Sequence, residues 1–387
     1  MHQNTRTLVC GMNGAALMAT AALVVTVQSC SSNEASAGAR EAPGTDVVLL
    51  SDKTSGCSDC IRLSETVVLG DTAGDGYVVH TDYVVRDSLG NYWLGQYKDM
   101  IKVYDANGRY LRRVGRAGDG PGEFSIPMPM YTDTRGRVHV LDPSRARETV
   151  LRSDFEVDTV RPFPAGMMRA APLLGSERYV ANAPNLLTAE GIGLPLHLTS
   201  GRDVVRSFGT TASGIVSPFS LVRVIATDQR GRIFSTWPFD FLIEVWADDG
   251  RRISAFQGPK LSEVEPQPGA FSDDHPPVTK VIAMQPDSRD RLWVLIWDVK
   301  EDWRSHMREV TMSGGRVVLQ PKDGLLNHMY DSRLDVLDLS TGTIVARWTG
   351  NRFFGAFTGG ATLVEFRALP DGTPQLALWQ YALADSR

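Results

Sequence analysis

The chain has 387 residues, of which 42% are apolar and 22% charged, and its 45 acidic and 40 basic residues give a net charge of −5. This composition suits a soluble globular body, and the length is within reach of one large all-β domain. The acidic balance and the lack of any basic run exclude a typical nucleic-acid-binding protein.

The first 29 residues predict a signal peptide. Arg6 is the only charged residue before Glu34, and residues 15–27 form an apolar run rich in small side chains. This run is too short to span a bilayer as a helix, but it suits the apolar region of a secretory signal. Such a segment is removed from the mature protein, so it takes no part in the expected fold.

Residues 27–30, Val-Gln-Ser-Cys, resemble the lipobox of bacterial lipoproteins. The resemblance implies cleavage behind Ser29 and a lipid on Cys30, which would then be the first mature residue. Ser31 in place of Asp favours the outer membrane, facing either the periplasm or the cell surface. The implied location is therefore the bacterial cell envelope, with the lipid as the only membrane attachment. Ordinary cleavage beside an unmodified Cys30 is the alternative.

Residues 30–45 predict a flexible tether. After Cys30 this stretch contains no apolar residue larger than alanine apart from Pro43. It has nothing to bury that would offset the entropy lost on ordering. The folded body is therefore expected to comprise residues 46–387.

Cys57 and Cys60 lie in the turn between two predicted strands, residues 45–52 and 61–70. A redox motif would open a helix in a βαβ unit, and a zinc site would need two further ligands, but neither context is visible. We expect a small-ring disulfide, which the chain-entropy account values at about 2 kcal/mol, formed in an oxidising compartment. Free thiols are the alternative.

Six copies of a strand–turn–strand unit recur along the chain, and four of their turns begin with Asp. The turns lie at residues 87–90, 133–136, 175–178, 228–231, 287–290 and 370–373. Asp87 and Asp133 are 46 residues apart. A period in the mid-forties with four short strands per unit predicts a β-propeller.

The segment "GRAGDGPGEF" at residues 115–124, with "DTRGRVHVLDPSRAR" at residues 133–147, resembles the NHL-type repeat. The resemblance implies a propeller, often of six blades, and specifies fold far better than activity. A phosphate-binding loop would precede a helix, but a strand follows here. We therefore expect the glycine-rich segment to connect two blades, with Phe124 wedged between them.

The predicted fold class is all-β, a six-bladed β-propeller whose sixth blade is closed by N-terminal and C-terminal strands. Residues 362–382 supply two inner strands before the chain ends. Strands near residues 46–51 and 62–69 are expected to complete that blade, which removes an exposed sheet edge. We expect the propeller to be a monomer.

The sequence contains no recognisable catalytic or metal-binding motif, and no cofactor is expected. Its seven histidines include no HxxxH or HExxH pair, and no GxSxG motif occurs. His139, within a predicted strand, is expected to be structural. Propeller lactonases related to gluconolactonase bind calcium through scattered carboxylates and Asn. A metal-dependent hydrolase or lactonase with a site in the central funnel is therefore the alternative function.

Two insertions flank the fifth unit. The connection from Gly258 to Asp287 has 29 residues, against 18 for the equivalent connection before Asp133. We name residues 259–277 the first insertion and residues 298–332 the second insertion. Both are expected side by side on the face opposite the Asp turns, which we name the loop-rich face, and such loops commonly carry function.

These insertions concentrate Trp and Arg, the residue types most enriched in binding hot spots. The candidate binding residues are Phe271, Asp273, Asp274, His275, Trp297, Asp298, Trp303, Arg304, His306 and Arg308. The resulting hypothesis is a binding scaffold for a protein, peptide or glycan partner. Two alternatives stay open: Trp297 and Trp303 merely pack the blade core, or the protein is a purely structural envelope component.

Overall fold

The computed structural model describes most of the chain from residue 47 onward. The described residues are 47–51, 60–78, 81, 83–96, 100–167, 169–173, 176, 178–183, 194–209, 222–264, 266, 271–312, 315, 317–322 and 326–384. The predicted signal peptide, Cys30, the tether and Cys57 lie outside them. Across the described residues, no helix combines the length and apolar character needed to cross a bilayer.

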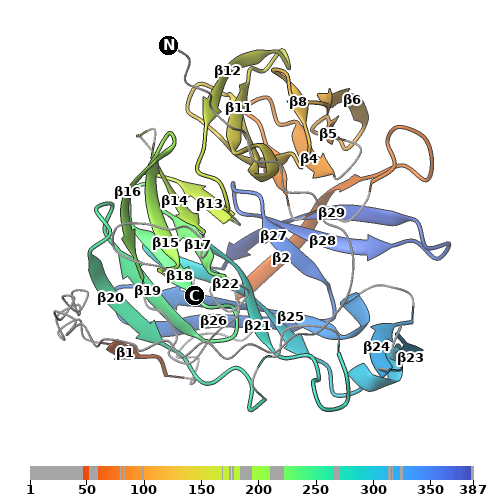
Figure 1. Ribbon diagram of the computed structural model, residues 1–387. Helices are drawn as coiled ribbons and strands as arrows, with labels where there is room; N and C mark the ends of the chain where they lie inside the picture. The colour runs from red at the N-terminus through yellow and green to blue at the C-terminus, as the bar shows by residue number, and fades with distance from the viewer. Residues whose placement is uncertain are drawn as a thin grey trace, which may run out of the picture. The chain divides into compact units, whose positions relative to one another are not determined.

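Within these residues the strands form six blades, and each blade contains four antiparallel strands (Figure 1). The first two blades are β3 (Val84–Arg86), β4 (Tyr92–Gln96), β5 (Met100–Tyr104), β6 (Tyr110–Val114), and β9 (Met128–Thr132), β10 (Val138–Asp142), β11 (Arg147–Leu151), β12 (Val157–Pro162). The next two are β13 (Arg169–Pro172), β14 (Arg178–Asn182), β15 (Leu196–Ser200), β16 (Asp203–Phe208), and β17 (Val224–Thr227), β18 (Ile233–Thr236), β19 (Leu242–Trp246), β20 (Arg252–Gln257). The last two are β21 (Lys280–Pro286), β22 (Arg291–Val299), β25 (Tyr330–Asp338), β26 (Thr343–Gly350), and β27 (Phe354–Phe357), β28 (Thr362–Ala368), β29 (Pro374–Leu383), β2 (Ile61–Leu69).

The first strand of each blade is its inner strand. Around the ring, β3 contacts β9, and the contacts continue from β9 through β13, β17 and β21 to β27. The core lies between neighbouring blades. One cluster, for example, joins Trp93 of the first blade to Val138 of the second, and both side chains are fully buried. The predicted six-bladed propeller is confirmed.

The sixth blade joins an N-terminal strand to the last strands of the described chain. β2 pairs antiparallel with β29, from Ile61 opposite Leu383 to Leu69 opposite Leu376 (Figure 1). Closure by N-terminal and C-terminal strands is therefore confirmed. The number of strands from each end differs from the expected two and two, because the C-terminal part contributes three strands and the N-terminal part only one.

The expected place of the first strand in the sixth blade is wrong. β1 (Val47–Leu49) instead pairs parallel with β20, at the outer edge of the fourth blade. Ser51 then bridges Thr343 on the outer strand of the fifth blade. Since β2 already covers β29, the free edge of β20 is where this short strand finds backbone partners.

The Asp turns fold through hydrogen bonds within the turn. The Oδ1 atom of Asp87 accepts the backbone N–H groups of Leu89 at 2.9 Å and Asn91 at 2.8 Å. Asp133, Asp228 and Asp287 bind the equivalent N–H groups. This side-chain mimicry of a backbone turn explains why Asp begins each of these four hairpins.

The second carboxylate oxygen of each Asp ties the turn to its blade. Asp87 Oδ2 accepts the indole N–H of Trp93 at 2.9 Å, and Asp133 Oδ2 pairs with the Arg137 guanidinium at 2.7 Å. Burial alone would raise the pKa of Asp133, but hydrogen bonds from Arg137 and His139 outweigh it and lower that pKa to about 2. The turn therefore keeps its negative charge.

The turn at residues 370–373 is not equivalent to the Asp turns. It connects β28 to β29, the second and third strands of the sixth blade, whereas the Asp turns connect first and second strands. The equivalent turn of the sixth blade is at residues 358–362, where the Thr358 N–H donates to Thr362 O at 3.0 Å. In the third blade, the Leu173 N–H donates to Arg178 O at 2.9 Å, which confirms the weaker repeat there.

The glycine-rich segment connects β6 of the first blade to β9 of the second, as predicted. It contains two short parallel strands, β7 (Arg116–Ala117) and β8 (Glu123–Phe124). Phe124 is fully buried in the cluster shared by the two blades. A Cβ atom at Gly115 would lie 2.5 Å from the Phe124 ring, and its φ of 82° also favours glycine.

His139 is a buried structural residue, as expected. Its Nδ1 lies 2.6 Å from Glu148 Oε1 and its Nε2 lies 3.3 Å from Asp133 Oδ2. The imidazole also stacks on the Tyr131 ring, with centroids 4.2 Å apart. These contacts hold the second blade together and leave the imidazole no ligand-facing role.

Candidate ligand-binding site

The two insertions lie side by side, as predicted. The Leu319 N–H donates to Phe271 O at 2.7 Å, and Arg304 pairs with Asp273 at 2.7 Å. The second insertion leaves the blade after β22, a second strand, so it emerges opposite the Asp turns. It contains β23 (Met307–Thr311), β24 (Val317–Pro321) and the short helices η3 (Trp303–His306) and η4 (Leu326–His328).

Most of the predicted binding residues stabilise the insertions. Phe271 and Trp303 pack against a buried cluster that also contains Trp297. Arg304 bridges Asp273 and Glu309, the latter at 2.9 Å. These contacts favour the packing alternative that the sequence left open for the tryptophans.

Other predicted residues also have partners, either within the insertions or on the adjoining strand β25. His275 Nδ1 lies 3.2 Å from Ser272 Oγ. Asp298 pairs with Arg333 at 3.1 Å, and burial raises the pKa of Asp298 while Arg333 opposes that rise. His306 Nε2 lies 3.3 Å from Asp302. Asp274 and Arg308 are exposed. The structure does not gather these side chains into one site.

A cavity of about 600 Å³ lies in the central channel, and residues from β3, β9, β13, β17, β21 and β27 all line it. Trp297, at the end of β22, and Leu326, in the second insertion, line the same cavity and place it toward the loop-rich face. We name this cavity the channel mouth. Trp297 is the one predicted binding residue among its described lining.

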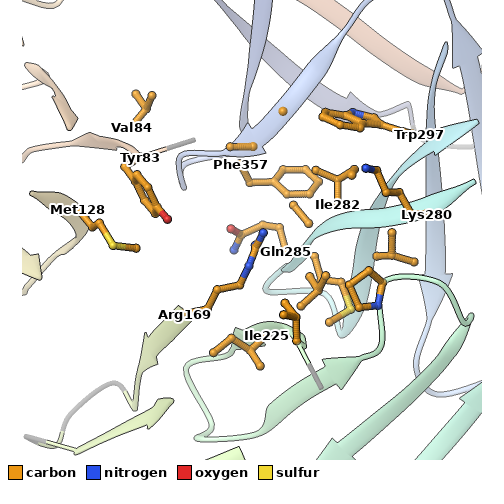
Figure 2. Close-up of a pocket in the computed structure, with 18 of the residues that line it drawn as sticks. Tyr83, Val84, Met128, Arg169, Ile225, Lys280, Ile282, Gln285, Trp297 and Phe357 are labelled. Atoms are coloured by element: carbon orange, nitrogen blue, oxygen red, sulfur yellow. The ribbon is translucent and has the colours of Figure 1, made fainter. Parts of the chain in front are cut away.

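The channel mouth combines apolar walls with a few polar groups (Figure 2). Its polar side chains are Tyr83, Arg169, Lys280 and Gln285. Figure 2 shows the Arg169 side chain extending from β13 toward the Gln285 amide. The apolar walls include methionine, phenylalanine and isoleucine side chains, such as Met128, Ile225, Ile282 and Phe357.

Lys280 and Trp297 form the outer part of the channel mouth. The Lys280 ammonium lies 5.1 Å from the Trp297 ring centroid and 5.3 Å from that of Tyr330. Attraction between a cation and an aromatic face stabilises this arrangement. Trp297 is itself 7% exposed and stacks on Phe353, with centroids 4.3 Å apart. The Trp297 ring, held in place by Phe353, thus keeps the positive charge of Lys280 above its face.

A second cavity, of about 730 Å³, lies at the end of the channel nearer the Asp turns. It is lined by the ends of the same inner strands and by residues 87–90 of the first turn. Gln285 and Phe357 line both cavities. The inner strands therefore border both cavities along the channel.

Sequence reasoning missed the residues of the channel mouth because they come from separate blades. Arg169 is the one polar residue of β13, and Lys280 and Gln285 are the two polar residues of β21, in strands that otherwise look like core. The available signal is their place in the repeat, because the strand before each first turn is the inner strand. Arg169, Lys280 and Gln285 all lie on such strands.

Among the described residues, no group of three or more His, Cys, Asp and Glu side chains is placed to hold a metal ion. Cys60 is in a disulfide. Its predicted partner, Cys57, is outside the described residues, so that pairing stays a prediction.

Solved structures that are similar to this chain share little sequence with it. A predicted exported protein of Bacteroides fragilis superposes with a TM-score of 0.53 at 11% identity, covering 87% of this chain and 100% of its own. A member of the DUF4221 family from Bacteroides vulgatus has a TM-score of 0.53 at 10% identity, covering 85% and 100%. Virginiamycin B lyase from Staphylococcus aureus has a TM-score of 0.39 at 11% identity, covering 82% and 99%.

No protein-family model matches the sequence, and a search of curated proteins found no match. At these identities the first two structures support the propeller fold alone. The resemblance to the NHL-type repeat stays a prediction.

Proposed function

We propose that this protein is a lipid-anchored binding protein of the bacterial cell envelope, and that its ligand occupies the channel mouth. The observation that carries the proposal is the cavity of about 600 Å³ to which all six inner strands contribute. Ligand pockets commonly have volumes of about 300–1,000 Å³, apolar walls and a few polar groups that orient the ligand. The channel mouth has each of these properties.

The sequence suggested a protein, peptide or glycan partner at the insertion surface. The contacts described above use most of that surface to hold the insertions together, whereas the channel mouth is a partly open cavity at the ring centre. We therefore narrow the proposed ligand to a small molecule. The hydrolase alternative is not proposed as a second function, because no contact among the described residues specifically favours it.

The envelope location rests on the signal-like N-terminus and the lipobox resemblance at residues 27–30. It agrees with the predicted export of one structural relative. Metabolic labelling with palmitate is expected to mark the wild-type protein and not the Cys30→Ser variant. A soluble, unlabelled mature form that begins at another residue would overturn the anchor.

Filling the channel mouth is expected to abolish binding of a small apolar probe. The neutral dye phenylnaphthylamine fluoresces more strongly in apolar surroundings, so titration reports its binding. The double variant Ile225→Trp/Ile282→Trp adds bulk at two side chains that lie in the cavity (Figure 2). We expect saturable binding by the wild type and at least about 10-fold weaker binding by the filled variant, the equivalent of about 1.4 kcal/mol.

The matched control places two tryptophans outside the channel. Leu111 and Val205, on the outer strands β6 and β16, are 46% and 55% exposed, and Leu111→Trp/Val205→Trp should bind the dye like the wild type. The proposal fails if the wild type does not bind the dye saturably, or if the filled and control variants bind it equally well.

A further inference from the structure

The described lining of the channel mouth is positively charged. It contains Arg169 and Lys280, and it contains no Asp or Glu. This composition is unusual for a chain whose acidic residues outnumber its basic ones, 45 to 40. A cavity with low-dielectric walls and charge of one sign concentrates its field on a ligand of the opposite sign.

Arg169 differs from the arginines of the repeated turns. Arg137, Arg232 and Arg291 each pair with an Asp four residues earlier. The Arg169 side chain makes no hydrogen bond or ion pair with any described residue, and it is solvent-exposed although its strand lines the channel. Figure 2 shows its guanidinium inside the cavity. A guanidinium placed in this way offers a planar set of donors that matches a carboxylate, sulfonate or phosphate.

The rest of the channel mouth suits an apolar body attached to that anion. Phe239, Trp297 and Phe357 provide aromatic surfaces, and Met128 and Met130 provide adaptable apolar ones. Lys280, held over Trp297, adds a second positive charge at the outer part of the mouth. Gln285 and Tyr83 are further polar groups able to orient a ligand.

We infer that the channel mouth binds a small organic anion with an aromatic or aliphatic body, and that Arg169 is the residue that binds its anionic group. This inference rests on the proposed function, which makes the channel mouth the ligand site. It goes beyond that function by naming the ligand class and the residue that selects it.

Two dyes that differ in one sulfonate group provide the test. Anilinonaphthalene sulfonate carries the anion, and phenylnaphthylamine is the same ring system without it. We expect the Arg169→Gln variant to bind the sulfonate dye about 10-fold more weakly than the wild type, the effect of losing a charge-assisted hydrogen bond. Its Kd for the neutral dye should stay within about two-fold, because the apolar walls are unchanged.

The control is Arg202→Gln, at an exposed arginine in the turn between β15 and β16. This variant should bind both dyes like the wild type. Unchanged sulfonate binding by Arg169→Gln, or an equal loss for both dyes, would overturn the inference while the binding function stands. If the wild type binds neither dye, both the inference and the proposed function fail.

Discussion

Replacing Leu69 by Ala is expected to lower the free energy of unfolding by about 2–5 kcal/mol, the usual range for a buried leucine. Leu69 is the last residue of β2, it is fully buried, and it lies opposite Leu376 of β29. The substitution leaves a cavity where the N-terminal strand closes the sixth blade. Urea denaturation followed by circular dichroism measures the loss.

Leu49→Ala is the matched control for ring closure. Leu49 also belongs to an N-terminal strand, but β1 lies at the outer edge of the fourth blade and Leu49 is 77% exposed. Its replacement should change stability by no more than about 0.5 kcal/mol, as at ordinary surface positions. Equal losses for the two variants would contradict the different roles assigned to β1 and β2.

Replacing Trp297 by Ala is expected to lower the free energy of unfolding by about 3–5 kcal/mol, the range for a buried aromatic side chain. The indole N–H donates to Phe354 O at 2.6 Å, and the ring stacks on Phe353. The substitution removes both contacts and leaves the Phe354 carbonyl without this donor. Thermal and urea denaturation of the purified variant measure the effect.

Trp297→Phe and Arg308→Ala test the origin of that loss. Trp297→Phe keeps an aromatic ring but loses the hydrogen bond to Phe354 O, so it should lower the free energy of unfolding clearly less than Trp297→Ala does. Arg308 is another residue predicted as a binding residue, but it is exposed on β23, and its replacement should cost no more than about 0.5 kcal/mol. A loss below about 1 kcal/mol for Trp297→Ala would show that the ring does not hold the fifth blade to the sixth.

The repeated fold was predictable because the Asp turns are specified locally. Asp87 and Asp133 bind N–H groups two and four residues ahead, so the responsible residues are neighbours in the sequence. The same local chemistry explains the error in the sixth blade. The Asp371 carboxylate accepts the Thr373 N–H at 2.9 Å, although this turn connects a different pair of strands. Turn chemistry identifies a hairpin but not its place in the blade.

The partner of β1 could not be predicted from its residues. A three-residue apolar strand satisfies its backbone groups at any free sheet edge, and the pattern does not say which edge is free. The outer strands β6, β12, β16 and β26 are sheet edges as well, so the choice of β20 depends on where the assembled ring places residues 47–49.

The channel mouth was unpredictable for a related reason. Arg169 and Lys280 are 111 positions apart in the chain, and neither belongs to a spaced motif. The insertions were more conspicuous because they interrupt the repeat and concentrate Trp and Arg. Long insertions can enlarge a blade as well as form a binding site. Their ion pairs, such as Arg304 with Asp273, mostly connect residues of the insertions to one another.

The most direct test of the account is a crystal structure of the protein with anilinonaphthalene sulfonate bound. The account predicts the naphthalene rings within the channel mouth and the sulfonate within hydrogen-bond distance of the Arg169 guanidinium. A dye bound only to the insertion surface or an outer blade edge, with the channel mouth unoccupied in the same crystal, would contradict it.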